Sequence, residues 1–271
     1  MLPSESSEEP LKRIMKIDRV LVSLNNNKTY TKFWNLIAPI WKYKFNIKPT
    51  LIFIGTVEEL KSNNFDMNYD IIQVEVSEMR GNRWGIPWTL FWLATQFPDD
   101  VCLTCGIDQI PLNHDFFKHI KDIDKEKFVV GISDAYFNYK LGTLSYFNTK
   151  SNILYPTAYN VALGKKFKNI FNIEDDVSDE LRKVFLTKDS FHLPLDLWGI
   201  DECYFSDVIA NYKYKEEIEL LGYYKFWGNK RLYDILNLDL NLLKRGYYSE
   251  FTNKELDVET MKKIIDLRFK S

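Results

Sequence analysis

Cysteine is scarce in this sequence: only Cys102, Cys105 and Cys203 occur among 271 residues. Three thiols cannot build the disulfide framework of a small secreted domain, so we expect a reducing compartment and a cytoplasmic protein. Cys102 and Cys105 form one C-x2-C pair, but no second pair follows, and a structural zinc site usually needs four ligands. The pair is therefore expected to be buried thiols at the end of a strand.

Long apolar runs and an excess of basic charge are also missing. No window of about 18 apolar residues occurs, so no membrane span is expected. The opening "MLPSESSEEP" is acidic and polar, the opposite of a signal peptide. With 36 basic and 38 acidic residues the formal net charge is -2, which disfavours binding of nucleic acid or anionic membrane over the whole surface.

Several motifs that carry known chemistry do not occur. The sequence has no G-x-G-x-x-G, no P-loop, no G-x-S-x-G and no H-E-x-x-H. These absences argue against a dinucleotide-binding dehydrogenase, a P-loop NTPase, an α/β-hydrolase and a zinc protease of that type.

Buried strands alternate with amphipathic helices along most of the chain. The pattern predicts strands within 19–26, 49–56, 69–77, 99–112 and 127–134, and helices within 29–45, 87–97, 114–120, 155–171, 195–212 and 258–269. This order predicts one α/β domain over residues 15–271, with a mainly parallel sheet flanked by helices. The region from about residue 223 is expected to be irregular, and residues 1–14 a disordered tail.

The segment "CGIDQIPL" is the most informative one. A buried strand ends at Gly106, and Asp108 follows in the loop. Ligands of open α/β sheets bind where the carboxyl ends of strands open onto loops, and a carboxylate there can hold a divalent cation against a diphosphate. Asp108 could equally serve as a cap or turn former.

This segment resembles the strand end of GT-A-type nucleotide-sugar glycosyltransferases, whose usual form is S-D-x-D-x-x-P-L. Asp108 matches the second acidic residue of that D-x-D motif, and Gly106 stands where the first would be. Three more segments resemble the same family in order and spacing: "VLVSLNNNKTY", "MRGNRWGIPWTLFWLATQF" and "LWGIDECYFSDVI". The likeness covers roughly residues 17–210 and implies a GT-A-like, Rossmann-like fold, in a viral or phage-like branch.

The resemblance implies a donor site in the first half of the chain and an acceptor site further on. The donor-binding residues would be Ser23, Asn25, Arg80, Arg83, Trp84 and Asp108, with Mn2+ or Mg2+ at Asp108. Arg80 and Arg83 flank Gly81 in a cationic loop suited to bidentate phosphate contacts, although they could be ordinary surface arginines.

The acceptor side is implied by the segment around Trp198. Trp198 and Gly199 would bind the acceptor, and Asp201 or Glu202 would be the general base, with Asp201 favoured and Asp134 as the next candidate. Acidic residues at the start of a helix are often plain caps, so a structural role is the alternative.

These observations predict a metal-assisted glycosyltransferase that uses a UDP- or GDP-type sugar donor. The acceptor would be a glycan, a protein or a modified nucleobase, and the near-neutral charge disfavours DNA. A nucleotidyltransferase is one rival, but "SLNNNKTY" lacks the glycine-rich basic loop of that class. A degenerate, non-catalytic nucleotide-sugar-binding module is the other, favoured by the missing acidic residue at Gly106. A viral source would place the protein in the host cytoplasm.

Overall fold

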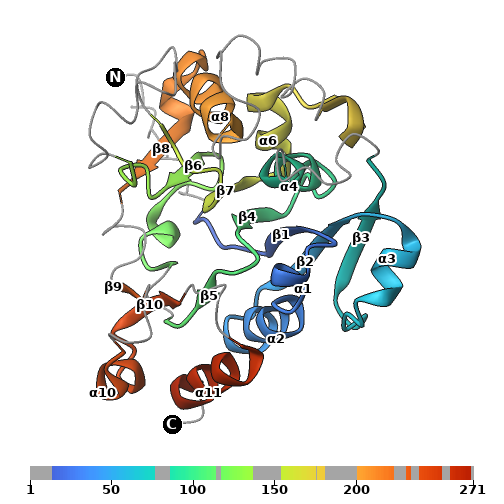
Figure 1. Cartoon of the computed structure of the whole chain (residues 1–271). Coiled ribbons are helices and arrows are strands. Elements are labelled where there is room, and N and C mark those ends of the chain that lie inside the picture. Colours follow the sequence, from blue (N-terminus) through green and yellow to red (C-terminus); the bar gives the residue numbers. More distant parts are fainter. Residues whose placement is uncertain are drawn as a thin grey trace, which may run out of the picture.

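The computed structural model describes residues 14–76, 86–113, 117–136, 154–174, 176–180, 200–222, 230–232, 238–251 and 257–269. Its main feature is a seven-stranded sheet with the order β3-β2-β1-β4-β7-β6-β8 (Figure 1). The strands are β1 (Arg19–Asn25), β2 (Lys48–Ile54), β3 (Asp70–Val74), β4 (Val101–Cys105), β6 (Phe128–Gly131), β7 (Asn160–Leu163) and β8 (Ile218–Leu221). Among these described strands β7 alone runs antiparallel to its neighbours. The prediction of a mainly parallel α/β sheet is confirmed.

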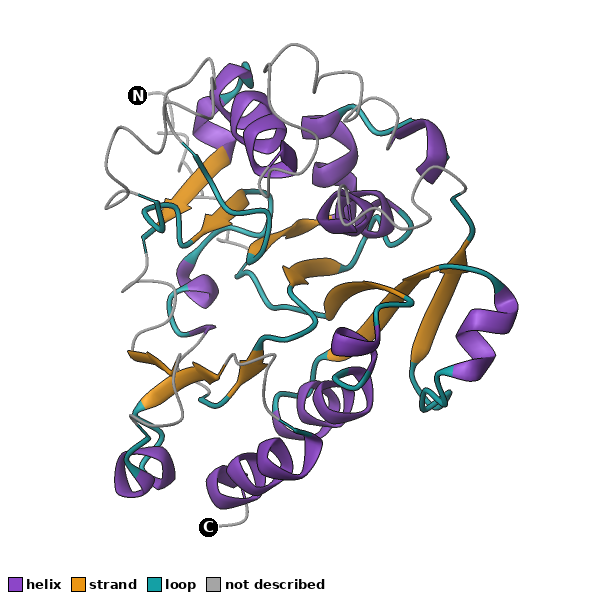
Figure 2. Cartoon of the chain, viewed as in Figure 1, coloured by secondary structure: helices purple, strands orange, loops and turns teal. Residues whose placement is uncertain are grey.

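Helices cover both faces of this sheet (Figure 2). One layer holds α1 (Lys28–Thr31), α2 (Trp34–Lys44) and α11 (Val258–Phe269); the other holds α4 (Ile86–Thr95), α6 (Gly164–Phe171) and α8 (Ile200–Asn211). Successive side chains of a strand point to opposite faces, so Val20 and Val22 of β1 join one core while Leu21 joins the other. Strands buried on both sides read as continuous apolar runs, as the sequence of β1 does.

The C-terminal region adds a small second sheet next to the end of β4. It consists of β5 (Ile110–Pro111), β10 (Tyr248–Phe251) and β9 (Lys230–Leu232), in the order β5-β10-β9. The short α10 (Leu240–Lys244) precedes β10, and Met261 and Ile264 of α11 are buried in the first core. The Arg268 guanidinium also donates to the Leu112 carbonyl over 2.6 Å. The C-terminal region is therefore packed against the main domain.

Three predicted elements differ from the structure. The expected helix over 155–171 is wrong in its first half, because residues 160–163 form β7, buried between β4 and β6, and α6 begins at Gly164. The helix expected from residue 114 is a short 3-10 helix, Ile120–Asp122, within described residues 117–122; residues 114–116 lie outside them. The helix α3 (Val57–Ser62) was not predicted, although a capping box between Thr56 and Glu59 defines its start.

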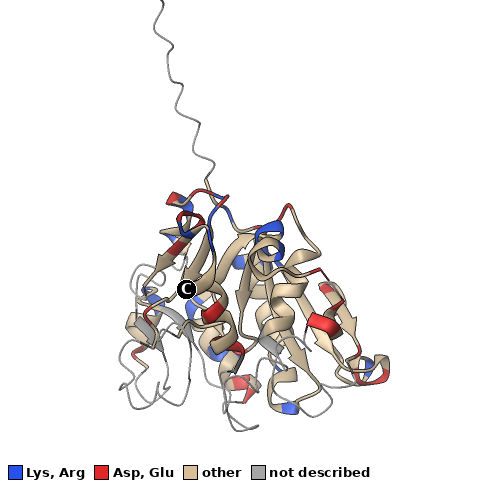
Figure 3. Cartoon of the chain, turned by 90° about the horizontal axis from the view of Figure 1, so that it is seen from above, with Lys and Arg blue, Asp and Glu red and all other residues tan. Residues whose placement is uncertain are grey.

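Three expectations from the composition concern the cysteines, the charges and the length of apolar helices. The three cysteines are free and buried, and burial raises the pKa of the Cys102 and Cys203 thiols. Acidic and basic residues are interspersed along the described elements (Figure 3). Of the helices in the described ranges, none has both the length and the hydrophobicity needed to span a bilayer.

Arg19, the first residue of β1, contacts residues near the amino-terminal ends of β2, β3 and β4. Its side chain is buried, stacks 3.7 Å from the centroid of the Phe97 ring and donates to Thr50 Oγ1 over 2.7 Å. The same guanidinium forms ion pairs of 2.9 Å with Asp70 and with Asp100. Thr50 lies in the first half of β2, Asp70 begins β3 and Asp100 precedes β4. One cation therefore connects the amino-terminal ends of these strands, which lie opposite to the strand ends that carry the predicted site.

Candidate active site

The carboxyl ends of β1 and β4 mark the point where the strand order reverses. The chain proceeds from β1 outward to β2 and β3, then returns to β4 on the other side of β1. Loops that leave such a pair of strands diverge, which opens the crevice where α/β sheets bind ligands. Asn25 ends β1 and Gly106 follows β4, so the structure brings the predicted donor-binding residue Asn25 and the loop that carries Asp108 to the same place.

The turn after β4 is tight, and Gln109 fills it. The Gly106 backbone N–H donates to Gln109 Oε1 over 2.5 Å, and the Gln109 N–H donates to the Gly106 carbonyl over 3.2 Å. A methyl group on residue 106 would lie 2.8 Å from Gln109 Oε1 and 3.2 Å from Asp108 Oδ1. The Gln109 amide therefore occupies the space beside Asp108 into which a side chain at position 106 would extend.

A polar cluster lies where β1 and β2 end. Asn26 donates to Glu59 Oε1 over 3.4 Å and accepts from Lys28 over 3.3 Å and from Asn63 over 2.9 Å. Glu59 also accepts from the Thr56 N–H, which closes the capping box of α3. These contacts fix the loop that follows Asn25 and present amide and ammonium groups beside the crevice.

Two of the predicted donor-binding residues, Ser23 and Asn25, lie on β1. Ser23 lies inside β1, opposite Ile52, and is 8% exposed. Asn25 is at the strand end, half-buried. Five other predicted residues lie outside the described ranges: Arg80, Arg83, Trp84, Trp198 and Gly199.

Asp201 and Glu202 lie in the first turn of α8, and both are buried. The Thr157 hydroxyl donates to Asp201 Oδ2 over 3.4 Å. The Tyr136 hydroxyl contacts both oxygens of Glu202, at 2.6 and 2.7 Å. Two adjacent carboxyl groups are thus held by hydroxyl donors from the segments that follow β6 and precede β7.

Burial perturbs both carboxyl groups. It raises the pKa of Asp201 to about 6, opposed by backbone N–H groups of the helix start and by the Thr157 hydroxyl. Burial, together with the negative charge of Asp201, raises the pKa of Glu202 well above its usual range, although the Tyr136 hydroxyl and the Thr157 N–H oppose this. Asp201 is therefore the member of the pair with a pKa of about 6, and its negative charge is one cause of the raised pKa of Glu202. Perturbed carboxyl pairs of this kind are a mark of functional sites.

The turn at residues 157–160 connects this pair to β4. The Thr104 hydroxyl donates to the Thr157 carbonyl and accepts from the Asn160 N–H, both over 3.0 Å. The Asn160 side-chain amide also donates to the Thr157 carbonyl, over 2.8 Å. Thr104 lies near the end of β4, just before the turn that carries Asp108. The hydrogen-bonded turn at residues 157–160 therefore fixes the position of Asp201 relative to Asp108.

Backbone strain occurs at the same edge of the sheet. Tyr159 and Ile132 have positive φ angles of 66° and 48°, and the Gly131 N–H donates to the Tyr159 carbonyl, so the two lie on neighbouring strand ends. A β-branched residue with positive φ is rare, and such strain concentrates at functional sites. Asp134 follows closely, exposed, and a methyl group on Gly222 would lie 2.7 Å from its Oδ2. Asp134 thus also stands at this edge.

Three residues of the site, Gln109, Tyr136 and Thr157, are not among those that the sequence predicts. The pair Pro156-Thr157 is a usable signal for one of them, since a proline within a predicted helix marks a break. Nothing local in the sequence indicates that Tyr136 contacts Glu202, because 66 positions separate them.

Comparison with known proteins gives structural neighbours only. No known family model and no curated protein matches the sequence. An active-site mutant of LgtC is similar with a TM-score of 0.53 and 11% identity, over 92% of this chain and 94% of that one. The galactosyltransferase LgtC in complex with donor and acceptor sugar analogs gives a TM-score of 0.51 and 9% identity, over 92% and 95%.

These likenesses extend over nearly the whole of each chain and share the mixed, mainly parallel sheet. The protein has the GT-A glycosyltransferase fold, as the sequence resemblance implied.

Proposed function

We propose that this protein is a glycosyltransferase that moves a sugar from a UDP- or GDP-type donor to a hydroxyl acceptor. The observation that carries the proposal is the meeting of two features at one edge of the sheet. The β1/β4 crevice carries Asn25 and Asp108, and the buried Asp201–Glu202 pair is joined to β4 through Thr157. A donor needs a pocket for its nucleotide and diphosphate, and an acceptor hydroxyl needs a nearby base.

The nucleotide would bind at the end of β1. Ser23, Asn25 and the polar cluster around Asn26 supply amide and hydroxyl groups there, and both donate and accept hydrogen bonds as a base and a ribose require. Arg80 and Arg83 would contact the diphosphate, with Trp84 beside them, because a guanidinium matches phosphate geometry bidentately.

Asp108 would hold Mn2+ or Mg2+. Magnesium is commonly held by one or two carboxylates together with substrate phosphates. Gly106 supplies no second carboxylate, and the Gln109 Oε1 accepts from the Gly106 N–H, so Asp108 fits a cation that arrives with the diphosphate. When bound, the cation would neutralise charge on the leaving diphosphate.

Asp201 would accept the proton of the acceptor hydroxyl if the transfer inverts the anomeric centre, and would position sugar hydroxyls if it retains. Trp198 and Gly199 would contact the acceptor, since an aromatic face beside a carboxylate suits a sugar ring. We propose a glycan or protein acceptor in preference to DNA, because net charge is -2. The three free cysteines fit a reducing compartment, and we place the reaction in the cytoplasm.

Titration with UDP- and GDP-sugars, with and without Mn2+, tests the proposal when paired with a transfer assay. Binding followed by transfer supports it. Binding without transfer would favour the non-catalytic module, and failure of both donor classes to bind would overturn the proposal.

Asp108→Ala is expected to remove the Mn2+-dependent part of donor binding, a loss of roughly ten- to a hundredfold, because it removes a charge-assisted contact. Calorimetry with and without Mn2+ measures this loss. Thermal unfolding should change little, because Asp108 is a half-buried turn residue. Asp122→Ala, an exposed acidic residue outside the crevice, is the matched control.

The Gly106→Asp/Gln109→Ala double variant gives the converse test. It adds the missing carboxylate and removes the side chain that would block it, so Mn2+ affinity should rise. A parental Mn2+ response in this variant and in Asp108→Ala would show that the loop holds no cation.

A further inference from the structure

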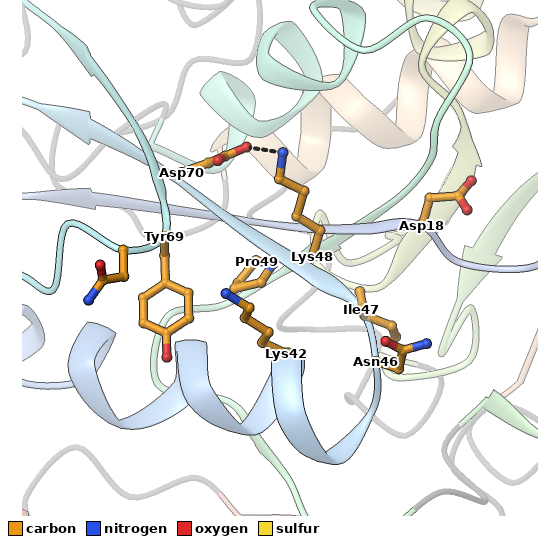
Figure 4. Close-up of a pocket in the computed structure, with 9 residues that line it drawn as sticks. Asp18, Lys42, Asn46, Ile47, Lys48, Pro49, Tyr69 and Asp70 are labelled. Carbon is orange, nitrogen blue, oxygen red and sulfur yellow. Dashed lines mark ion pairs between the residues drawn. The ribbon is translucent and has the colours of Figure 1, made fainter.

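A pocket of about 330 Å3 lies at the opposite edge of the sheet from the proposed active site. It is formed where α2 ends and where β1, β2 and β3 begin (Figure 4). Most of the side chains that line it are polar, and they include Asp18, Lys42, Asn46, Lys48, Asn68 and Asp70. Parallel strands place their amino and carboxyl ends at opposite edges, so this pocket is distinct from the β1/β4 crevice.

Three polar side chains of the pocket lack a hydrogen-bonding partner within the described part of the chain. No carboxylate there lies within ion-pair distance of the Lys42 ammonium, whose neighbours are the rings of Tyr69 and Tyr43, at 5.3 and 5.5 Å. The side-chain amides of Asn46 and Asn68 make no hydrogen bond to described residues, and both residues are exposed. In Figure 4 the Lys42 and Tyr69 side chains lie side by side.

The charges of the pocket are balanced. Lys48 pairs with Asp70 over 2.7 Å, and Asp70 also pairs with Arg19. Asp18, at the other end of the pocket from Tyr69, accepts from the Val101 N–H. Two ammonium and two carboxylate groups line the pocket, so an inorganic anion would meet Asp18 and Asp70, and a metal cation would meet the lysines.

Hydroxyl groups suit such a lining. Each hydroxyl both donates and accepts, amide side chains do the same, ammonium groups only donate and ionised carboxylates only accept. A saccharide presents adjacent hydroxyls on a ring whose C–H face can pack on an aromatic side chain, and the Tyr69 ring lines the pocket beside Lys42. The volume, about 330 Å3, is at the lower end of the roughly 300–1,000 Å3 of small-ligand sites. One or two sugar rings fit this size.

We propose that this pocket is a second saccharide-binding site, in which Lys42, Asn46 and Asn68 hold the hydroxyls of a neutral mono- or disaccharide. The site goes beyond the proposed transfer reaction, since it shares no residue with the β1/β4 crevice and does not require the donor.

Saturation-transfer difference NMR tests the site, with lactose, maltose and cellobiose as probes at millimolar concentration. At least one disaccharide should receive saturation from the parent protein and from Asp108→Ala, also in the presence of excess UDP. Lys42→Met and Asn68→Ala change exposed side chains, so they should fold normally, and each should weaken binding by about tenfold, the share of one such hydrogen bond. Lys44→Met, on the same helix but outside the pocket, should bind as the parent does.

Four results would overturn the proposal. The first is that none of the three disaccharides receives saturation, and the second is that the pocket variants bind as well as the parent. The third is that UDP displaces the disaccharide or that binding is lost in Asp108→Ala, since either would place the disaccharide in the β1/β4 crevice. The fourth is that inorganic phosphate displaces the disaccharide, which would indicate an anion site. Failure of donor binding by the parent would instead count against the proposed transferase alone, because saccharide binding here is measured without donor.

Discussion

Asp201→Asn is expected to lower the rate of sugar transfer by about 10²–10⁴ while the donor still binds, because general base catalysis contributes about that much. Asparagine keeps the size of the side chain and a hydrogen bond to Thr157 but cannot take a proton. Single-turnover transfer and donor calorimetry, measured on the same preparation, separate the two effects.

Glu202→Gln is the matched comparison. Burial and the neighbouring charge raise the pKa of Glu202, which disfavours its ionised form, and glutamine resembles the neutral form closely. The Tyr136 hydroxyl can still donate to the glutamine oxygen. We expect a much smaller loss of rate. If both variants transfer sugar at the parental rate, the pair is not catalytic, and Asp134 becomes the residue to replace.

The pH profile follows from the same burial. A general base acts in its ionised form, and the pKa of Asp201 is about 6. The rate should therefore rise as pH increases through about 6 and level off above it, and this inflection should be absent from Asp201→Asn. A flat profile for the parent between pH 5 and 7 would contradict the assignment.

Arg19→Met is expected to lower the free energy of unfolding by about 2–4 kcal/mol. The substitution keeps most of the apolar contact with Phe97 but removes two ion pairs and the hydrogen bond to Thr50. The side chains of Asp70 and Asp100 are 40% and 37% exposed, so they rehydrate, and the loss stays below that for a fully buried pair. Urea unfolding measures it.

Lys48→Met is the control that removes a positive charge beside Asp70 without removing the contacts of Arg19. Lys48 also pairs with Asp70, but it is 55% exposed, and exposed pairs contribute at most about 1 kcal/mol. Equal destabilisation by the two variants would mean that Arg19 has no special role.

Acid unfolding gives a second measurement of the Arg19 cluster. Burial raises the pKa of Asp70, but hydrogen bonds from Lys48 and Arg19 outweigh it and lower the pKa below its ordinary 3.8. Stability from this group is therefore present above pH 3.8 and is lost as pH falls through the folded-state pKa. In Arg19→Met one cause of the lowered Asp70 pKa is removed. The free energy of unfolding of this variant should therefore fall less than that of the parent as the pH is lowered from 3.8.

The strands were the most predictable part of the fold. The apolar runs of β1, β2, β4 and β6 are buried on both faces, and such runs are visible in sequence. The sequence pattern of β7 instead predicts a helix, because Asn160–Leu163 is short and leads directly into the amphipathic α6. Only its pairing with β4 and β6 makes it a strand, and pairing is not a local property.

The site was predictable where a motif marks a strand end. Asp108 follows from the end of β4, and Asp201 and Glu202 from the start of α8. The filling of the turn by Gln109 and the contact of Tyr136 with Glu202 depend on side-chain packing between segments, which a single sequence does not encode locally.

The position of β1 in the middle of the sheet has a consequence for synthesis of the chain. One edge of β1 pairs with β2, which follows soon after it. The other edge stays unpaired until β4, which begins at Val101, has been synthesised. β4 in turn exposes its outer edge until β7 has been made. During translation the nascent chain therefore carries open strand edges flanked by apolar faces, the arrangement that recruits other chains. Residues 55–100 separate β2 from β4, so the open edge of β1 persists until they have been synthesised. The yield of active protein should therefore rise when this segment is translated faster and when the concentration of nascent chains is lower.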